Sequence, residues 1–194
     1  MPEQFYTPKK VQPQKQLVRG KMVDVIVVEG EEYDICKEHS QNRWSNKKTG
    51  EWGRGLNNTK EDPAKVERVG LFGEMAFAKI LGLSVDITYR ENGDKGADFM
   101  ICDQKLNIKT AMRDYGKLLV KVNQLTSDLY VEGLLIEEDS VNKKATVAIT
   151  GYCTRQALVD KPTVPAMKGN HQNKEMPRNE LLSIEALMHE SVLV

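Results

Sequence analysis

The fold is decided by residues 68–110, which read RVGLFGEMAFAKILGLSVDITYRENGDKGADFMICDQKLNIKT. Just before this stretch, Asp62 offers a helix N-cap and Pro63 suits the first helical position. Apolar or small residues then recur at helical spacing, namely Val66, Val69, Gly73, Phe77 and Ile80. The pattern predicts an amphipathic helix over about 63–81.

One acidic residue, Glu74, lies inside this predicted helix. Its neighbours three and four residues away are glycine, leucine, phenylalanine and alanine, so its carboxylate projects from a mostly apolar or backbone-exposed face. A carboxylate in such surroundings needs a partner. That partner is either a cationic side chain, for which Lys109 is one candidate, or a bound metal ion.

A hairpin is predicted downstream of the helix. The residues GDKG at 93–96 are typical of a turn, residues 97–101 read as a strand, and Asp103 and Gln104 close the hairpin onto a second strand over 105–110. Because side chains alternate along a strand, Asn107 and Lys109 share one face of the second strand.

The polar face of the second strand suggests a metal site if it meets Asp98 and Glu74. The cluster would then contain two carboxylates, the Asn107 amide oxygen and the Lys109 ammonium. Hard oxygen ligands of this kind suit Mg²⁺ or Mn²⁺. Taken separately, each acid has a plainer interpretation, as a salt-bridge partner on the helix or a turn residue in the hairpin.

Three segments carry a family resemblance: GLFGE at 70–74, GADF at 96–99 and NIK at 107–109. In this order they resemble the PD-(D/E)XK nuclease superfamily, and most of all its small phage and bacterial members. The resemblance implies an α/β fold of the restriction-endonuclease type, with a central mixed sheet of five or six strands flanked by helices. It places the core at about 62–152 and implies a Mg²⁺-dependent deoxyribonuclease, acting as an endonuclease or an exonuclease.

The resemblance also assigns roles to single residues. Glu74, Asp98 and the carbonyl of Ile108 would be metal ligands, and Lys109 would orient or activate the attacking water. Asn107 would stand where the family usually has a second strand carboxylate, and it is the departure from the pattern.

An amide oxygen is a neutral and weaker ligand for a hard dication than a carboxylate. Either the site therefore binds metal more loosely, or a nearby acid such as Asp94 or Asp103 compensates. A protein that keeps the nuclease-like fold and binds DNA without turnover, and a phage interaction protein, are the alternatives. The DNA form, whether duplex, branched or single-stranded, stays open at this stage.

Composition places the chain among soluble globular proteins. Its 194 residues fit a single domain at 22–194 preceded by an arm, with 40% hydrophobic and 29% charged residues. The sequence shows no apolar run of membrane-spanning length and no signal peptide, so we expect a cytoplasmic protein, in the host cell if phage-encoded, without a membrane partner. A homodimer is compatible with these features.

Charge and cysteine usage restrict the function classes further. The 28 basic residues equal the 28 acidic ones, so contacts to DNA must come from local patches. The three cysteines are scattered and odd in number, which argues against a disulfide framework. Cys36 and His39 have the spacing of half a zinc site, but no second pair follows them.

Basic side chains near two tryptophans form a candidate nucleic-acid surface. Trp44 and Trp52 either stack on bases or sugars beside these charges or pack on the core. The candidate binding residues are Lys47, Lys48, Arg54 and Arg113. Residues 1–21 hold five basic residues and one acid among three prolines, and they are expected to form a flexible basic arm that tethers phosphates or merely solubilises the chain.

The rest of the chain supplies further strands and helices. Strands are predicted over 22–28, 117–122, 130–137 and 145–152. Helices are predicted over 33–44, 154–159 and 181–188.

Overall fold

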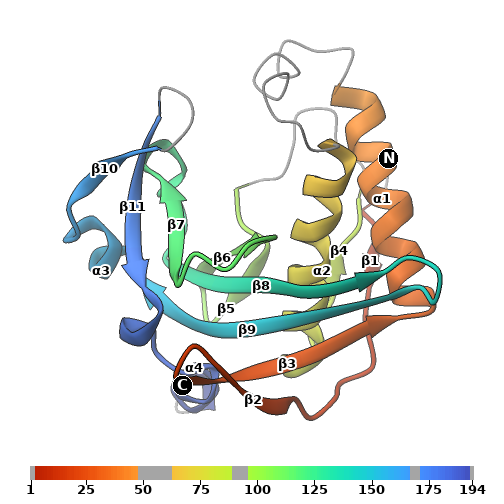
Figure 1. Ribbon diagram of the computed structural model, residues 1–194, viewed down its shortest axis with the longest axis horizontal. Helices are drawn as coiled ribbons and strands as arrows, with labels where there is room; N and C mark the ends of the chain where they lie inside the picture. Colours follow the sequence, from red (N-terminus) through yellow and green to blue (C-terminus); the bar gives the residue numbers. More distant parts are fainter. Residues whose placement is uncertain (1–2, 48–62, 89–95, 167–170, 193–194) are drawn as a thin grey trace.

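The computed structural model describes the backbone of residues 3–47, 63–88, 96–166 and 171–192, and the side chains of 3–43, 64–88, 96–166 and 171–188. Its architecture is a curved sheet with helices packed against it and a smaller sheet at one end (Figure 1). The predicted α/β class is confirmed at this level. Within the described segments, no helix combines the length and the apolar composition needed to cross a bilayer.

The main sheet has six strands in the order β2-β3-β9-β8-β6-β5. All its neighbouring strands are antiparallel except β6 and β8, so the sheet is mixed, as predicted. Its strands are β2 (Gln14–Val18), β3 (Lys21–Glu29), β9 (Lys144–Thr154), β8 (Leu129–Asp139), β6 (Gln104–Ala111) and β5 (Phe99–Ile101).

Three helices share one core with this sheet. They are α1 (Glu31–Lys47), α2 (Pro63–Leu81) and α4 (Ile184–Val192). Phe72 and Phe77 of α2 are fully buried, Tyr33 of α1 stacks on Phe72, and Leu187 of α4 joins the same cluster. The bounds predicted for α2 are confirmed, because the proline start and the apolar spacing act together.

A second, three-stranded sheet lies at the end of the main sheet. It has the order β10-β11-β7, with β10 (Thr163–Pro165), β11 (Gln172–Pro177) and β7 (Lys117–Lys121). It shares a separate small core with β8, β9 and α3 (Arg155–Val159), in which Tyr130 and Leu158 are fully buried. Short 3₁₀ turns lie over η2 (Val122–Gln124) and η3 (Arg178–Glu180). The strand predicted at 117–122 exists but belongs to this smaller sheet.

The prediction of a flexible arm at 1–21 is wrong for the residues of this range that the structure describes. β1 (Phe5–Tyr6) pairs with β4 (Val85–Asp86), and β2 forms a hairpin with β3. The hairpin turn is Arg19-Gly20, and both residues have positive φ, at 48° and 81°. This backbone is the primed two-residue turn that matches the strand twist. The prolines lie outside β1 and β2, so they do not prevent pairing.

β6 packs closely under α2. A Cβ atom on Gly73 of α2 would lie 1.8 Å from Oγ1 of Thr110, and one on Gly133 of β8 would lie 2.8 Å from it. Thr110 therefore points toward α2, together with the core residues Leu106 and Ile108 at alternate positions. Asn107 and Lys109 accordingly point to the other face of β6, as the alternation predicted.

Candidate active site

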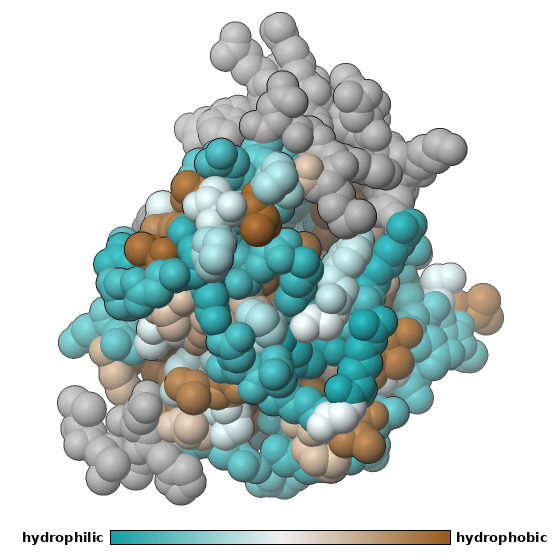
Figure 2. Space-filling view, turned by 60° about the vertical axis from the view of Figure 1, so that its left-hand side comes forward, coloured by the Kyte–Doolittle hydropathy of each residue, from teal (hydrophilic) through white to brown (hydrophobic). Residues whose placement is uncertain are grey.

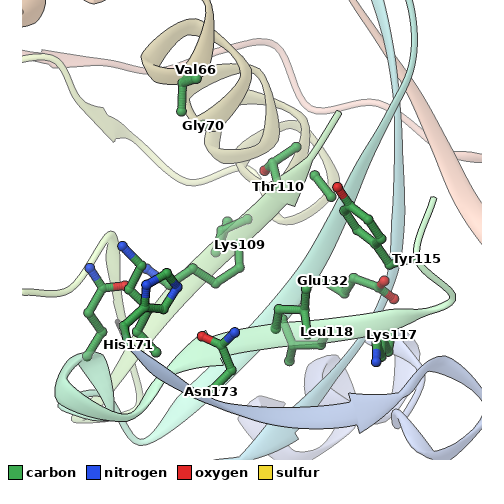
Figure 3. A pocket seen from close by; sticks show the side chains of 15 residues that line it. Val66, Gly70, Lys109, Thr110, Tyr115, Lys117, Leu118, Glu132, His171 and Asn173 are labelled. Carbon is green, nitrogen blue, oxygen red and sulfur yellow. The ribbon is translucent and has the colours of Figure 1, made fainter. Parts of the chain in front are cut away.

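A pocket of about 410 Å³ lies beside the second half of β6 (Figure 3). Residues 108–111 of β6 line it between Val66 and Gly70 of α2 on one side and β7, His171 and Asn173 on the other. We call it the β6 pocket. Figure 2 shows the side of the molecule that carries the smaller sheet, where most of the described surface is hydrophilic.

The position of this pocket follows from the shortness of β5. β5 pairs with β6 only as far as Phe99 and Leu106, and no described strand continues the pairing along this edge. Beyond Phe99, Asp98 forms the next hydrogen bonds to β6. Its backbone N–H donates to the Leu106 carbonyl at 2.9 Å, and its Oδ2 accepts from the backbone N–H of Ile108 at 2.6 Å. The Asp98 carboxylate is thereby fixed beside residues 107–109.

The hydrogen bond to Asp98 also orients the Ile108 carbonyl. In a strand, the N–H and C=O of one residue point to the same edge. The N–H of Ile108 points to the edge where Asp98 lies, so its carbonyl oxygen points there too. Ile108 also lines the β6 pocket. Its carbonyl is thus directed to the edge at which a cation ligand was predicted.

The Asn107 side chain carries a hydrogen-bond acceptor to which no described residue donates. Its Oδ1 is buried and accepts no hydrogen bond from any residue that the structure describes. Leaving a buried acceptor unsatisfied costs about 1–3 kcal/mol. A cation would satisfy this oxygen, so the donor set of Asp98 and Asn107 fits a Mg²⁺ or Mn²⁺ ion.

Lys109 is half-buried and lines the β6 pocket. It stands opposite Glu132 in the register of β6 and β8. In Figure 3 its side chain extends into the pocket on the side where His171 lies. Of the predicted site residues, Ile108 and Lys109 therefore line the pocket, whereas Glu74, Asp98 and Asn107 do not.

Glu74 lies on the pocket side of α2 but does not line the pocket. It follows Val66 and Gly70 at four-residue spacing, so the three share one side of the helix. The Glu74 side chain is half-buried. The Glu74 carboxylate also acts on Cys36 of α1. Burial raises the pKa of the Cys36 thiol, and the negative charge of Glu74 raises it further. Glu74 thus lies one helical turn from the pocket lining.

A buried ion cluster borders the pocket, and sequence analysis missed it. Glu132, only 2% exposed, accepts hydrogen bonds from Nε and Nη2 of Arg178 at 2.9 and 2.8 Å and another from Thr150. Arg178 also pairs with Asp114 at 2.9 Å. Burial alone would raise the pKa of Asp114, but hydrogen bonds from Arg178 and Gly116 hold it below its usual value. Residues 132 and 178 are too far apart in the chain for a local pattern to link them.

The predicted nucleic-acid residues are not part of this pocket as described. Arg113 is exposed and does not line it. The side chains of Lys47, Lys48, Arg54 and both tryptophans lie outside the described residues. Asp94, one of the two acids expected to compensate for Asn107, also lies outside them. The other, Asp103, is exposed in the hairpin turn. Four residues of strand place it about 13 Å from Asn107, too far to share a cation.

No three or more His, Cys, Asp or Glu side chains gather into a metal cluster within the described segments. A site built from two acids and one amide does not need such a group. Cys36 and Cys153 are buried and Cys102 is exposed, and no disulfide joins them. Comparison of the chain with models of protein families, with curated proteins and with solved structures finds no match.

Proposed function

We propose that this protein hydrolyses phosphodiester bonds in DNA with Mg²⁺ or Mn²⁺, using a restriction-endonuclease-like fold of the PD-(D/E)XK type. The observation that carries the proposal is the hydrogen bond from Ile108 N–H to Asp98 Oδ2. It holds the Asp98 carboxylate at the backbone of Ile108, which lines the pocket together with Lys109, and the adjacent residue Asn107 carries the unsatisfied oxygen. A carboxylate and an amide oxygen can both bind a hard cation, and an ammonium can offset charge on a phosphate.

In the proposed mechanism, Asp98, Asn107 Oδ1 and the Ile108 carbonyl would hold the cation, and Glu74 of α2 would be a further ligand. A cation held there would supply Lewis-acid chemistry, namely a lower pKa for a coordinated water and compensation of the phosphate charge. Lys109 extends into the pocket, where its ammonium orients the attacking water and stabilises the negative charge that develops on the phosphoryl oxygens. The Asp98 carboxylate is held in position because the backbone N–H of Ile108 donates to it.

The test is incubation with supercoiled, linear, branched and single-stranded DNA, each with Mg²⁺, Mn²⁺ or a chelator. We expect metal-dependent cleavage of at least one form and its loss in Lys109→Ala and Asp98→Ala. Lys143→Ala is the matched control, because Lys143 lies exposed in the turn between β8 and β9, where it pairs with Asp34 of α1. Unchanged cleavage by Lys109→Ala under Mg²⁺ would refute the assignment.

A DNA-binding protein that does not cleave is the second candidate, and Asn107 favours it. A neutral ligand in place of an acid weakens the hold on a hard dication. The variant Asn107→Asp distinguishes the two candidates. If the site binds metal, the added carboxylate should increase the stabilisation by Mg²⁺ in thermal unfolding and raise any cleavage rate. A scaffold without a metal site should show no Mg²⁺-dependent shift in either form.

A further inference from the structure

The β6 pocket has a second polar wall that the proposed chemistry does not use. Lys121 of β7 and Asn173 of β11 are direct cross-strand partners, and both line the pocket. His171 lines it just before β11 begins. The alternation of β7 puts Leu118 and Val120 into the small core, which turns Lys121 toward the pocket.

The side chains of this wall have spare hydrogen-bonding capacity. Within the described part of the chain, Lys121, His171 and Asn173 form no side-chain hydrogen bond and no ion pair. Lys121 is exposed, while His171 and Asn173 are half-buried. Figure 3 shows His171 and Asn173 on the wall formed by the smaller sheet. These donors face the same pocket as Lys109, so one ligand can contact both.

The charges around the pocket favour an anion. Three lysines line it, at 109, 117 and 121, against one acid, Glu132, and of these lysines Lys117 is paired with Glu175 outside the lining. Glu132 is already matched by the two hydrogen bonds from Arg178. The whole chain has equal numbers of basic and acidic residues, so this positive surplus is local. A concave surface with a surplus of one sign of charge raises the local concentration of the opposite ion.

We propose that Lys121, His171 and Asn173 form a subsite for a phosphate of a single-stranded nucleic-acid segment, next to the phosphate attacked beside Lys109. The nature of the ligand rests on the proposed function. The choice of a single strand rests on size, because about 410 Å³ is the volume of a pocket for one small ligand. Tyr115, which is 46% exposed and also lines the pocket, offers a ring on which a base stacks.

The test measures binding without cleavage. A short fluorescein-labelled oligodeoxynucleotide is titrated in chelator by fluorescence anisotropy, at several salt concentrations, in single-stranded and duplex form. For the single strand, Lys121→Ala should weaken binding and lower the slope of log K against log salt by about 0.7, the value for one lost phosphate contact. His171→Ala and Asn173→Ala should weaken binding as well. Thermal unfolding checks that each variant is folded.

Lys143→Ala serves again as the control, because it removes one exposed positive charge outside the pocket lining. Its affinity and salt slope should equal those of the wild type. If Lys121→Ala behaves like Lys143→Ala, or if the wild type does not bind the single strand, the subsite is refuted. If Lys121 affects only duplex binding, the assignment to a single strand is refuted.

The proposed hydrolysis is judged separately. Binding that depends on Lys121, with no cleavage of any DNA form under Mg²⁺ or Mn²⁺, would refute hydrolysis and support the subsite. Cleavage that is abolished in Lys109→Ala but unchanged in Lys121→Ala, with unchanged binding, would support hydrolysis and refute the subsite. The two proposals thus fail in different experiments.

Discussion

The two sides of β6 differ in how their stability arises. On the side of α2, Leu106 is fully buried, and Thr110 fits against Gly73 with no room for another atom. On the other side, Lys109 borders an open pocket, and Glu132 is buried only with the help of Arg178. The helix side therefore depends on steric fit, and the pocket side depends on matched charges. A protein built in this way can keep a polar pocket without losing its core.

The largest effect is expected on the pocket side, from Arg178→Met. The substitution leaves Glu132 buried at 2% exposure without its counter-charge. Removing one partner of a buried ion pair costs about 3–5 kcal/mol of unfolding free energy. Urea unfolding at neutral pH measures the loss.

The double variant Arg178→Met with Glu132→Gln provides the control for that measurement. It removes both charges, so it should recover part of the stability that the single change loses. A loss below about 1 kcal/mol in the single variant would show that the charges are not what holds this side together.

A smaller effect is expected on the helix side, from Gly73→Ala. The new Cβ would lie 1.8 Å from Thr110 Oγ1 and 3.0 Å from Thr110 Cβ, so α2 or β6 must shift. Overpacking of this kind costs about 1–3 kcal/mol. Urea unfolding should show the loss, and Thr110→Ala in the same chain should reverse much of it because the clashing hydroxyl is gone. Equal costs with and without Thr110 would contradict the steric account.

The contrast between the two sides also marks the limit of prediction from sequence. The bounds of α2 and the alternation of β6 follow from neighbouring residues, so both were predicted correctly. The hydrogen bond between Asp98 and Ile108 arises within one hairpin, and the motif order pointed to that hairpin. These features are local in the chain.

The second wall of the pocket combines residues that lie far apart in the chain. β7 pairs with β11, so that Lys121 stands beside Asn173 after more than fifty intervening residues. No periodicity in either segment specifies that partner, and β7 was therefore expected in the main sheet. β2 was missed for a related reason. Its basic residues and nearby prolines resemble a mobile segment, and only the hairpin with β3 makes it a strand.

Acid should weaken the pocket side selectively. Arg178 and Gly116 hold the pKa of Asp114 below its usual value although burial opposes them. A carboxyl group with a lowered pKa in the folded state stabilises the fold above its unfolded pKa, near 3.9, and that contribution is lost as the pH falls through the folded pKa. Unfolding free energies should therefore fall below about pH 4.

Asp114→Asn tests whether that fall comes from this group. The variant should be less stable than the wild type at neutral pH and should lose less stability on acidification, in urea titrations at matched pH. Gly73→Ala acts on the helix side and should lower the whole curve without changing its slope. Parallel curves for Asp114→Asn and the wild type would contradict the assignment.

The smallest effect is expected from Gly70→Ala, three residues from Gly73 on the same helix. A Cβ on Gly70 meets no atom within 4 Å, because it enters the pocket and not the core. Alanine is favoured over glycine inside a helix by about 1 kcal/mol, so the variant should be slightly more stable than the wild type. Gly70→Leu should keep most of that stability while its side chain fills the pocket and weakens oligonucleotide binding. A gain of stability in Gly70→Ala and a loss in Gly73→Ala would show that one helix faces both a pocket and a core. Destabilisation by Gly70→Ala would contradict the open space at position 70.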